Sequence, residues 1–239
     1  QGYIKQTVYD QAMKEKVIFS PDAGQSIKAP HFVFFVKSYL EEKYGVEALD
    51  QGMKVYTTLD LNMQQLAERS ITRYAADNAK NSKAKNAALV AMDPKTAQIL
   101  VMVGSANYFD TTNEGNFNVA TAHRQPGSSF KPIVYATAFG KGYTPDTVLF
   151  DVPTEFETGC TKAACYKPVN YDGKYVGPIA LRDALAQSRN VPAVKILYLA
   201  GVQDSVDQAK RMGIKSLTNA NRYGLTLVLG GGGVSLLDM

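Results

Sequence analysis

Hydrophobic residues recur with a helical period in the first fifty residues of the chain. Between His31 and Tyr44 they follow the i, i+3, i+4 spacing of an amphipathic helix, at Phe32, Phe35, Val36, Tyr39 and Leu40. Gly45 is a typical helix stop. Residues 6–16 predict a shorter helix with polar residues on most faces. This region holds too little core to fold alone, so we expect it to pack on the residues after it.

The period of the pattern changes after Gly52. Residues 53–59 alternate and are rich in β-branched side chains, which predicts a strand. Asp60 is a good N-cap, and the residues after it predict a helix to about Asn78. The stretch 78–86 is polar and rich in lysine, which predicts a solvated loop.

Two apolar runs come next, at residues 87–92 and 99–103, and the turn-forming residues 93–96 lie between them. This arrangement predicts a β-hairpin. Strands that are apolar at every position are typical of a sheet that is covered on both faces. Helices and a hairpin in this order predict a mixed α+β fold.

Composition narrows the class of protein. The chain has 239 residues, 45% of them hydrophobic, which suits one sizeable domain or two small ones. The net charge is +4, and basic and acidic residues are interleaved, so we expect no nucleic-acid partner. No apolar run approaches the roughly 18 residues of a membrane span. The chain begins at Gln1 and ends at Met239 in what reads as the opening of a helix, so we expect a piece of a longer protein.

Cysteine, histidine and glycine patterns point away from metals and nucleotides. Cys160 and Cys165 have the spacing of half a zinc site, but His31 and His123 are far apart in sequence and supply no second half. A local disulfide in an oxidising compartment is the favoured interpretation, and two reduced thiols are the alternative. The stretch Gly230–Gly233 has no P-loop lysine. We therefore expect no metal and no cofactor.

The most informative stretch for chemistry is 124–132, with the sequence RQPGSSFKP. Pro126-Gly127 indicates a turn, which places Ser128 at or near the N-cap of an apolar helix. Lys131 lies one helical turn further on the same face, so a neutral amine there can take the serine proton without any histidine. Lysine has a reference pKa of about 10.4 and can act as this base only if its surroundings lower that value.

The alternative to an activated serine is a purely structural one: an N-cap serine followed by a lysine whose amine reaches solvent. The chain carries its own comparison, because residues 82–85 (SKAK) also fit Ser-x-x-Lys. That copy lies in a polar stretch without an apolar helix behind it, and we interpret it as solvated surface.

A second constellation lies in the helical stretch 181–200. Pro192 interrupts the pattern, which places residues 188–190 on a turn between two helices. Ser188 there can relay a proton between Lys131 and a leaving amine, and Asn190 can hold a substrate amide. Helix capping by Ser188 and Asn190 is the alternative.

With these motifs the sequence resembles the transpeptidase domain of penicillin-binding proteins, in particular the bifunctional class A branch. The resemblance extends over essentially the whole chain. The stretches that carry it are 30–33, 52–60 with Gln64 and 67–68, 88–104, 124–132, 166–172 with Gly177, and 188–193.

The resemblance implies an α/β mixed fold of the penicillin-binding protein and serine β-lactamase type. Residues 1–50 would be the linker between a glycosyltransferase and the transpeptidase, and 51–239 the N-terminal part of the transpeptidase domain. The family's third motif, Lys-Thr-Gly, is absent, and Gly230–Gly233 resembles a loop that precedes it. We therefore expect the activity to belong to a parent protein that is also a glycosyltransferase.

The implied function is a peptidoglycan DD-transpeptidase that cross-links stem peptides. Ser128 would attack the D-Ala-D-Ala carbonyl, Lys131 would be its base, Ser188 would shuttle the proton and Asn190 would orient the donor peptide. The implied partners are stem peptides, β-lactams and other proteins of cell-wall synthesis. An anchor outside this chain would hold the protein on the extracytoplasmic side of the cytoplasmic membrane.

Two alternatives remain at the level of sequence. One is a β-lactamase or DD-carboxypeptidase, against which the linker-like residues 1–50 and Arg189 argue. The other is a non-catalytic domain that senses β-lactams or serves as a scaffold. The four intact residues Ser128, Lys131, Ser188 and Asn190 count against that second alternative.

Overall fold

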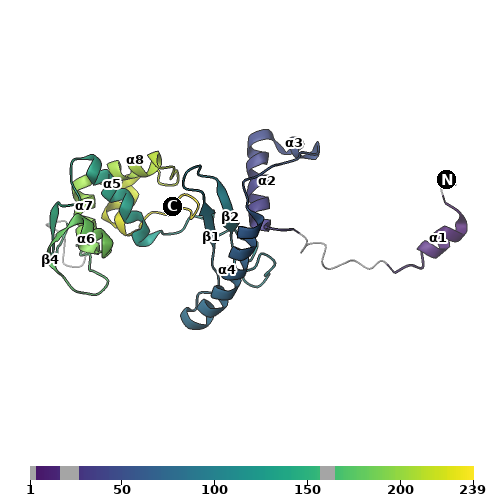
Figure 1. Cartoon of the computed structure of the whole chain (residues 1–239), viewed down its shortest axis with the longest axis horizontal. Coiled ribbons are helices and arrows are strands. Elements are labelled where there is room, and N and C mark those ends of the chain that lie inside the picture. The colour runs from purple at the N-terminus through teal and green to yellow at the C-terminus, as the bar shows by residue number, and fades with distance from the viewer. Residues whose placement is uncertain (1–3, 17–26, 157–164) are drawn as a thin grey trace.

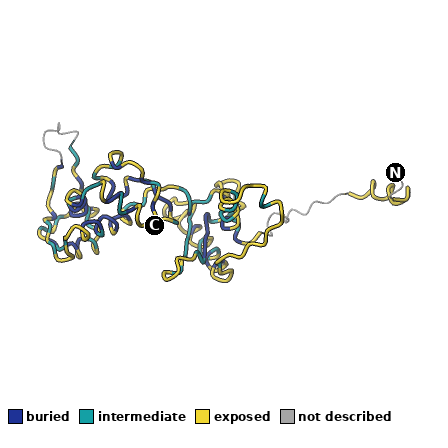
Figure 2. The backbone as a smooth tube through the Cα atoms, turned by 90° about the horizontal axis from the view of Figure 1, so that it is seen from above, coloured by how far each residue is buried: buried dark blue, intermediate teal, exposed yellow. Residues whose placement is uncertain are grey.

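A computed structural model describes residues 4–16, 27–156 and 165–239. The molecule is elongated, with a helix at one end, a hairpin flanked by helices in the middle and a helical body at the other end (Figure 1). The end helix, α1, spans Gln6–Ala12, so it is shorter than predicted. None of its residues is buried, and Figure 2 shows it exposed along its length.

The middle region is built around an antiparallel hairpin, as predicted. Strand residue Leu89 pairs with Val103, and the register shifts by one residue near Met92. The elements of this region are α2 (Pro30–Tyr44), α3 (Val46–Asp50), α4 (Leu61–Ser82), β1 (Leu89–Met92) and β2 (Ile99–Val103).

Helices cover both faces of the hairpin. On one face Phe32 of α2 packs with the fully buried Met102 of β2. On the other face Ala67 of α4 packs with Val101 and Val103. The expectation that the first region packs on later residues is thereby confirmed for α2, while the division into residues 1–50 and 51–239 stays a prediction.

Two local predictions in this region are wrong. Residues 53–59 form no strand. Their hydrogen bonding to β2 is limited to the Thr58 hydroxyl, which donates to Ile99 O, and the next residue, Asp60, donates its N–H to Leu100 O. Val55 and Tyr56 are exposed, so the alternation has no buried face to stabilise it. Its β-branched residues favour an extended backbone, but a strand also needs a ladder.

The second error concerns the length of α4. Asp60 caps the helix as predicted, since its carboxylate accepts the backbone N–H groups of Asn62 and Met63, both at 2.9 Å. The helix then continues to Ser82 and ends where Lys83 adopts a left-handed φ of 55°. The polar residues 78–82 are solvent-exposed helix rather than loop, because a polar sequence excludes burial but not helical geometry.

The helical body at the other end contains the largest hydrophobic core. Its central helix α7 (Asn190–Ala200) packs against α5 (Lys131–Gly140), and seven of its eleven residues are buried. The remaining elements are η2 (Gly127–Phe130), β3 (Val148–Asp151), β4 (Gly177–Ala180), α6 (Leu181–Ala186), α8 (Val202–Arg211), η3 (Ala220–Arg222) and η4 (Gly224–Leu229). β3 and β4 pair antiparallel as a second two-stranded sheet.

Within the described parts of the chain, no helix combines the length and the apolar character that crossing a bilayer requires.

One side chain joins α4 to the hairpin. The buried Gln64 accepts the N–H of Met102 at 2.9 Å and donates to the carbonyl of the same residue at 3.0 Å. A glutamine amide thus replaces a neighbouring strand at this position of β2. The pairing satisfies both backbone groups of a residue with no solvent access.

We predict that Gln64→Leu destabilises the chain strongly, because it leaves both backbone groups of Met102 buried without a partner. Each such group costs about 1–3 kcal/mol. The measurement is urea denaturation followed by circular dichroism. Gln65→Leu is the matched control on the exposed side of the same helix. Equal unfolding midpoints for the two variants would refute this role of the Gln64 side chain.

Candidate active site

The turn that carries Ser128 precedes α5. Residues Gly127–Phe130 form a 3₁₀ turn, and α5 begins at Lys131 with Pro132 in its first turn. Ser128 is near the helix start, as predicted, but the N-cap is Phe130. Among the described residues the Ser128 hydroxyl has no hydrogen-bond partner, and Ser128 is exposed. The capping interpretation therefore fails, and Ser128 lies at the surface of the described chain.

Lys131 is completely buried, so its amine does not reach solvent. Its Nζ donates to three oxygens of the second motif: the Ser188 carbonyl at 2.6 Å, the Ser188 hydroxyl at 3.1 Å and Asn190 Oδ1 at 2.8 Å. Two of the other predicted site residues, Ser188 and Asn190, are thereby each hydrogen-bonded to Lys131. Ser128 lies one turn before the amine along the chain and is not bonded to it.

Burial lowers the pKa of Lys131 from 10.5 to about 8. Desolvation disfavours the charged ammonium, and none of the ion pairs among the described residues gives this amine a carboxylate. A substantial fraction of Lys131 is therefore neutral near pH 8. The neutral amine has a lone pair with which it can accept a proton, and the Ser188 hydroxyl can then turn its hydrogen toward Nζ.

The turn of the second motif lies between two helices as predicted, but it ends at Arg189, because Asn190 is already the first residue of α7. α6 ends at Ala186, α7 begins at Asn190, and Pro192 lies in the first turn of α7, where it removes no intrahelical bond. Ser188 adopts a left-handed φ of 52°, which is costly for a residue with a Cβ. Neither Ser188 nor Asn190 caps the helix. The N-cap residue is Arg189, and its side chain makes no capping hydrogen bond.

Neighbouring residues hold the Asn190 side chain at both ends. Its Oδ1 accepts from Lys131, and its Nδ2 donates to the Val169 carbonyl at 2.9 Å. The backbone N–H of Asn190 donates to Oδ1 of the buried Asn170 at 2.8 Å. Sequence reasoning gave Asn170 no role of its own. The signal was its place in the stretch 166–172, which carries the family resemblance.

The glycine-rich loop Gly230–Gly233 packs against the turn that carries Ser128. Arg124 and Val234 form an isolated antiparallel bridge, with N–H···O distances of 2.8 and 2.9 Å in the two directions. The loop then approaches so closely that a Cβ on Gly230 would lie 2.2 Å from the backbone N of Gly127. The stretch Gly230–Gly233, for which the sequence offered only a resemblance, therefore packs directly on the candidate nucleophile turn.

The second Ser-x-x-Lys copy behaves as surface. Residues 82–85 are exposed at the end of α4, and Lys83 serves as its left-handed C-cap. The two copies share a pattern and differ in burial. Burial of the amine, rather than the spacing of serine and lysine, is what distinguishes the chemical site.

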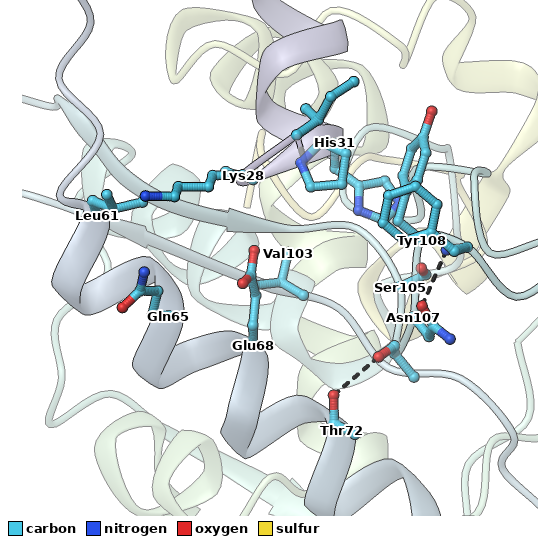
Figure 3. A pocket seen from close by; sticks show the side chains of 15 residues that line it. Lys28, His31, Leu61, Gln65, Glu68, Thr72, Val103, Ser105, Asn107 and Tyr108 are labelled. Atoms are coloured by element: carbon cyan, nitrogen blue, oxygen red, sulfur yellow. Dashed lines mark hydrogen bonds between the residues drawn. The ribbon is translucent and has the colours of Figure 1, made fainter. Parts of the chain in front are cut away.

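A cavity of about 350 Å³ lies elsewhere, between α2, α4 and the end of β2 (Figure 3). His31, Glu68 and Tyr108 line it. His31 is buried, its Nε2 is 2.9 Å from the carbonyl of Gly115, and burial lowers the pKa of its ring. This histidine is a packing residue of the region around α2. A smaller cavity, of about 160 Å³, lies beside Ser188 and is lined by Asn170 and Arg189.

The cysteine prediction falls partly outside the described residues. Cys165 is disulfide-bonded, which agrees with the oxidised interpretation, and Cys160 lies in the stretch 157–164.

Comparison with known proteins matches the chain to one family. The family described as "Penicillin binding protein transpeptidase domain" matches residues 87–224, more than half of the chain. Penicillin-binding protein 2D of Bacillus subtilis is 36% identical over 224 residues, which are 90% of this chain and 31% of that protein. Penicillin-binding protein 1A of Neisseria meningitidis is 34% identical over 178 residues, 70% of this chain and 22% of that protein.

Solved structures show the same fold. The crystal structure of penicillin-binding protein 1A from Haemophilus influenzae superposes with a TM-score of 0.75 at 21% identity and covers 99% of this chain and 48% of that one. PonA1 from Mycobacterium tuberculosis in complex with penicillin V gives a TM-score of 0.68 at 22% identity, over 89% of this chain and 57% of that one.

The fold and the family match agree on the class, a penicillin-binding protein transpeptidase domain. The chain belongs to the penicillin-binding protein transpeptidase family, and the relatives it matches are class A members. It spans about a third of the length of the curated relative from Bacillus subtilis. The predicted mixed α+β fold is confirmed.

We predict that Gly230→Ala slows acylation of Ser128 and destabilises the protein by about 1–3 kcal/mol, the range for overpacking. The new methyl group meets the Gly127 backbone, and φ at Gly230 is +89°. The measurements are the rate of labelling by fluorescent penicillin and the thermal midpoint. Gly140→Ala is the control, because apart from its chain neighbours and the backbone of its own helix no atom lies within 4 Å of its added Cβ. A wild-type labelling rate in Gly230→Ala would contradict the support assigned to the loop.

Proposed function

We propose that the protein to which this chain belongs is a peptidoglycan DD-transpeptidase, with Ser128 as its nucleophile. The observation that carries the proposal is the buried Lys131 amine, whose pKa is about 8 and whose partners are Ser188 and Asn190. An amine of this kind is the base that an otherwise unpartnered serine needs. The family relationship supports the same assignment.

The first half-reaction moves one proton and one acyl group. Neutral Lys131 takes the proton of Ser128, and the Ser128 oxygen attacks the carbonyl carbon of the penultimate D-Ala. The Ser128 N–H is one oxyanion donor. When the intermediate collapses, the C–N bond breaks, and the proton on Lys131 passes through the Ser188 hydroxyl to the leaving amine. D-Ala departs and Ser128 carries an ester.

The second half-reaction reverses the proton path. An amine of a neighbouring stem peptide attacks the ester, the proton it loses passes back to Ser128 through Ser188 and Lys131, and an amide cross-link forms. Asn190 would orient the donor peptide, and its fixed side chain suits that task. A second oxyanion donor and the carboxylate-binding residues would come from parts of the protein outside this chain.

β-Lactams would acylate Ser128 in the same way, as small acylating analogues of the donor. From the relatives we further propose that the same protein contains a glycosyltransferase and a membrane anchor outside this chain. Its location would be extracytoplasmic, and its partners would act in cell-wall synthesis. Residues 1–50 would link the two enzymatic parts.

We predict that fluorescent penicillin labels the full-length protein stably at Ser128 and that Ser128→Ala abolishes the label. Ser82→Ala is the matched control, because it removes the serine of the exposed Ser-x-x-Lys copy, and it should label as the wild type. Peptide mapping checks the position. Label retained in Ser128→Ala would refute the site, rapid hydrolysis would indicate a β-lactamase, and a stable label without cross-linked muropeptides would indicate a sensor.

We predict that the acylation rate rises with pH, with a midpoint near 8 and a plateau above it. The sign follows from the mechanism, since Lys131 accepts a proton only in its neutral form, which predominates above its pKa of about 8. Stopped-flow labelling between pH 6 and 10 measures the profile. Lys131→Arg should abolish acylation, because a guanidinium stays charged over this range. Acylation that persists in that variant would show that Lys131 is not the base.

A further inference from the structure

A network of buried polar side chains lies beneath the turn formed by residues 188–190. At its centre Asn170 is only 3% exposed, and its side-chain amide makes four hydrogen bonds. Its Oδ1 accepts the N–H groups of Asn190 at 2.8 Å and Val191 at 3.2 Å. Its Nδ2 donates to Asp151 Oδ1 at 2.7 Å and to the Lys174 carbonyl at 2.8 Å. All hydrogen-bonding positions of this amide are therefore occupied.

The network supplies what α7 lacks at its start. The first N–H groups of a helix have no intrahelical partner, and the N-cap residue Arg189 offers no side-chain cap. Asn170, twenty residues earlier in sequence, provides it instead. A cap from a distant segment fixes the helix start relative to the rest of the body, which a local cap cannot do.

Asp151 holds Asn170 in the orientation that this cap requires. The carboxylate has no solvent access, and it can only accept hydrogen bonds, so it selects the NH2 side of the amide. Because the NH2 group of Asn170 faces Asp151, the Oδ1 atom on the other side of the amide faces the start of α7. The second oxygen of Asp151 accepts from the Val176 N–H at 3.3 Å and lies 3.8 Å from Arg189 Nε.

Arg189 holds the middle of the same turn. Its Nη1 donates to Asp172 at 3.0 Å and to the Lys174 carbonyl at 3.1 Å. Each residue of the turn therefore has a separate tie: Ser188 to Lys131, Arg189 to Asp172, and Asn190 to both Lys131 and Asn170. This is the support that can keep Ser188 in its left-handed conformation.

We propose that Asn170, oriented by Asp151, is a positioning residue for acyl transfer: it fixes the start of α7 so that Ser188 and Asn190 present their oxygens to the Lys131 amine. Asn170 touches neither the amine nor a substrate and acts through Asn190. The inference rests on the proposed function of Ser128 and Lys131. A displacement of about 1 Å in such a site can cost on the order of a hundredfold in rate.

The test exchanges the two side chains in the full-length protein. Asn170→Asp removes the donor to Asp151 and sets two carboxylates against each other, so acylation by fluorescent penicillin should slow by about tenfold or more. Adding Asp151→Asn restores the hydrogen bond in the reverse direction, because the new asparagine at 151 donates to the new aspartate at 170. Most of the acylation rate should then return. Asn170→Ala removes the cap without adding charge and should be as slow as Asn170→Asp.

The control and the readout separate positioning from stability. Asn219→Ala deletes another asparagine cap, which accepts the Asn221 N–H at 3.0 Å far along the chain from the site, and it should leave the acylation rate unchanged. In every variant the final amount of label counts the folded molecules, and the concentration dependence separates binding from the acylation rate constant. The expected loss is in the rate constant, with full labelling at the end point.

Two outcomes would overturn the proposal. One is a wild-type rate constant in Asn170→Ala and Asn170→Asp. The other is a double exchange that stays as slow as Asn170→Asp although it labels fully. Failure of the proposed function is recognised separately, because wild-type protein would then take up no label, or Ser128→Ala would keep it.

Discussion

The structure of the site depends on the burial of one amine. Lys131 lies at the start of α5 with no solvent access, and its three acceptors all come from residues 188–190, at the start of α7. Removing an ammonium from water is costly, which lowers its pKa to about 8, and the acceptors keep the cost tolerable. The hydrophobic packing of α5 on α7 therefore encloses the amine, and this burial is what lowers the pKa of Lys131.

The surrounding elements hold the two sides of that contact in place. On one side, the bridge from Arg124 to Val234 and the close approach of Gly230 support the turn that carries Ser128. Behind Asn190, the Asn170 and Asp151 side chains fix the second motif. Both supports come from segments distant in sequence. The helical body can thus be understood as a frame that sets the separation of two short motifs.

Several features resulted from local physical chemistry and were predictable. Asp60 caps α4, Gly45 ends α2, the apolar runs pair as a hairpin, and Pro192 lies in the first turn of a new helix. One error arose where a strand-like pattern found no neighbouring strand, and the other where a polar segment stayed helical without being buried. Residues 53–59 alternate without a ladder to join, and residues 78–82 are polar yet stay helical because α4 is exposed there.

By itself the sequence determined the residue types of the site and the turns that present them, because glycine, proline and capping residues act within a few positions of the backbone. It favoured residues 128–131 over the second Ser-x-x-Lys copy at 82–85, because an apolar helix follows only the first, but it could not determine whether the Lys131 amine is buried. Only the tertiary structure decided that, by burying Lys131 and exposing the other copy. The reason is that a lysine pKa depends on what packs around the amine, and for Lys131 those atoms lie almost sixty residues further along the chain.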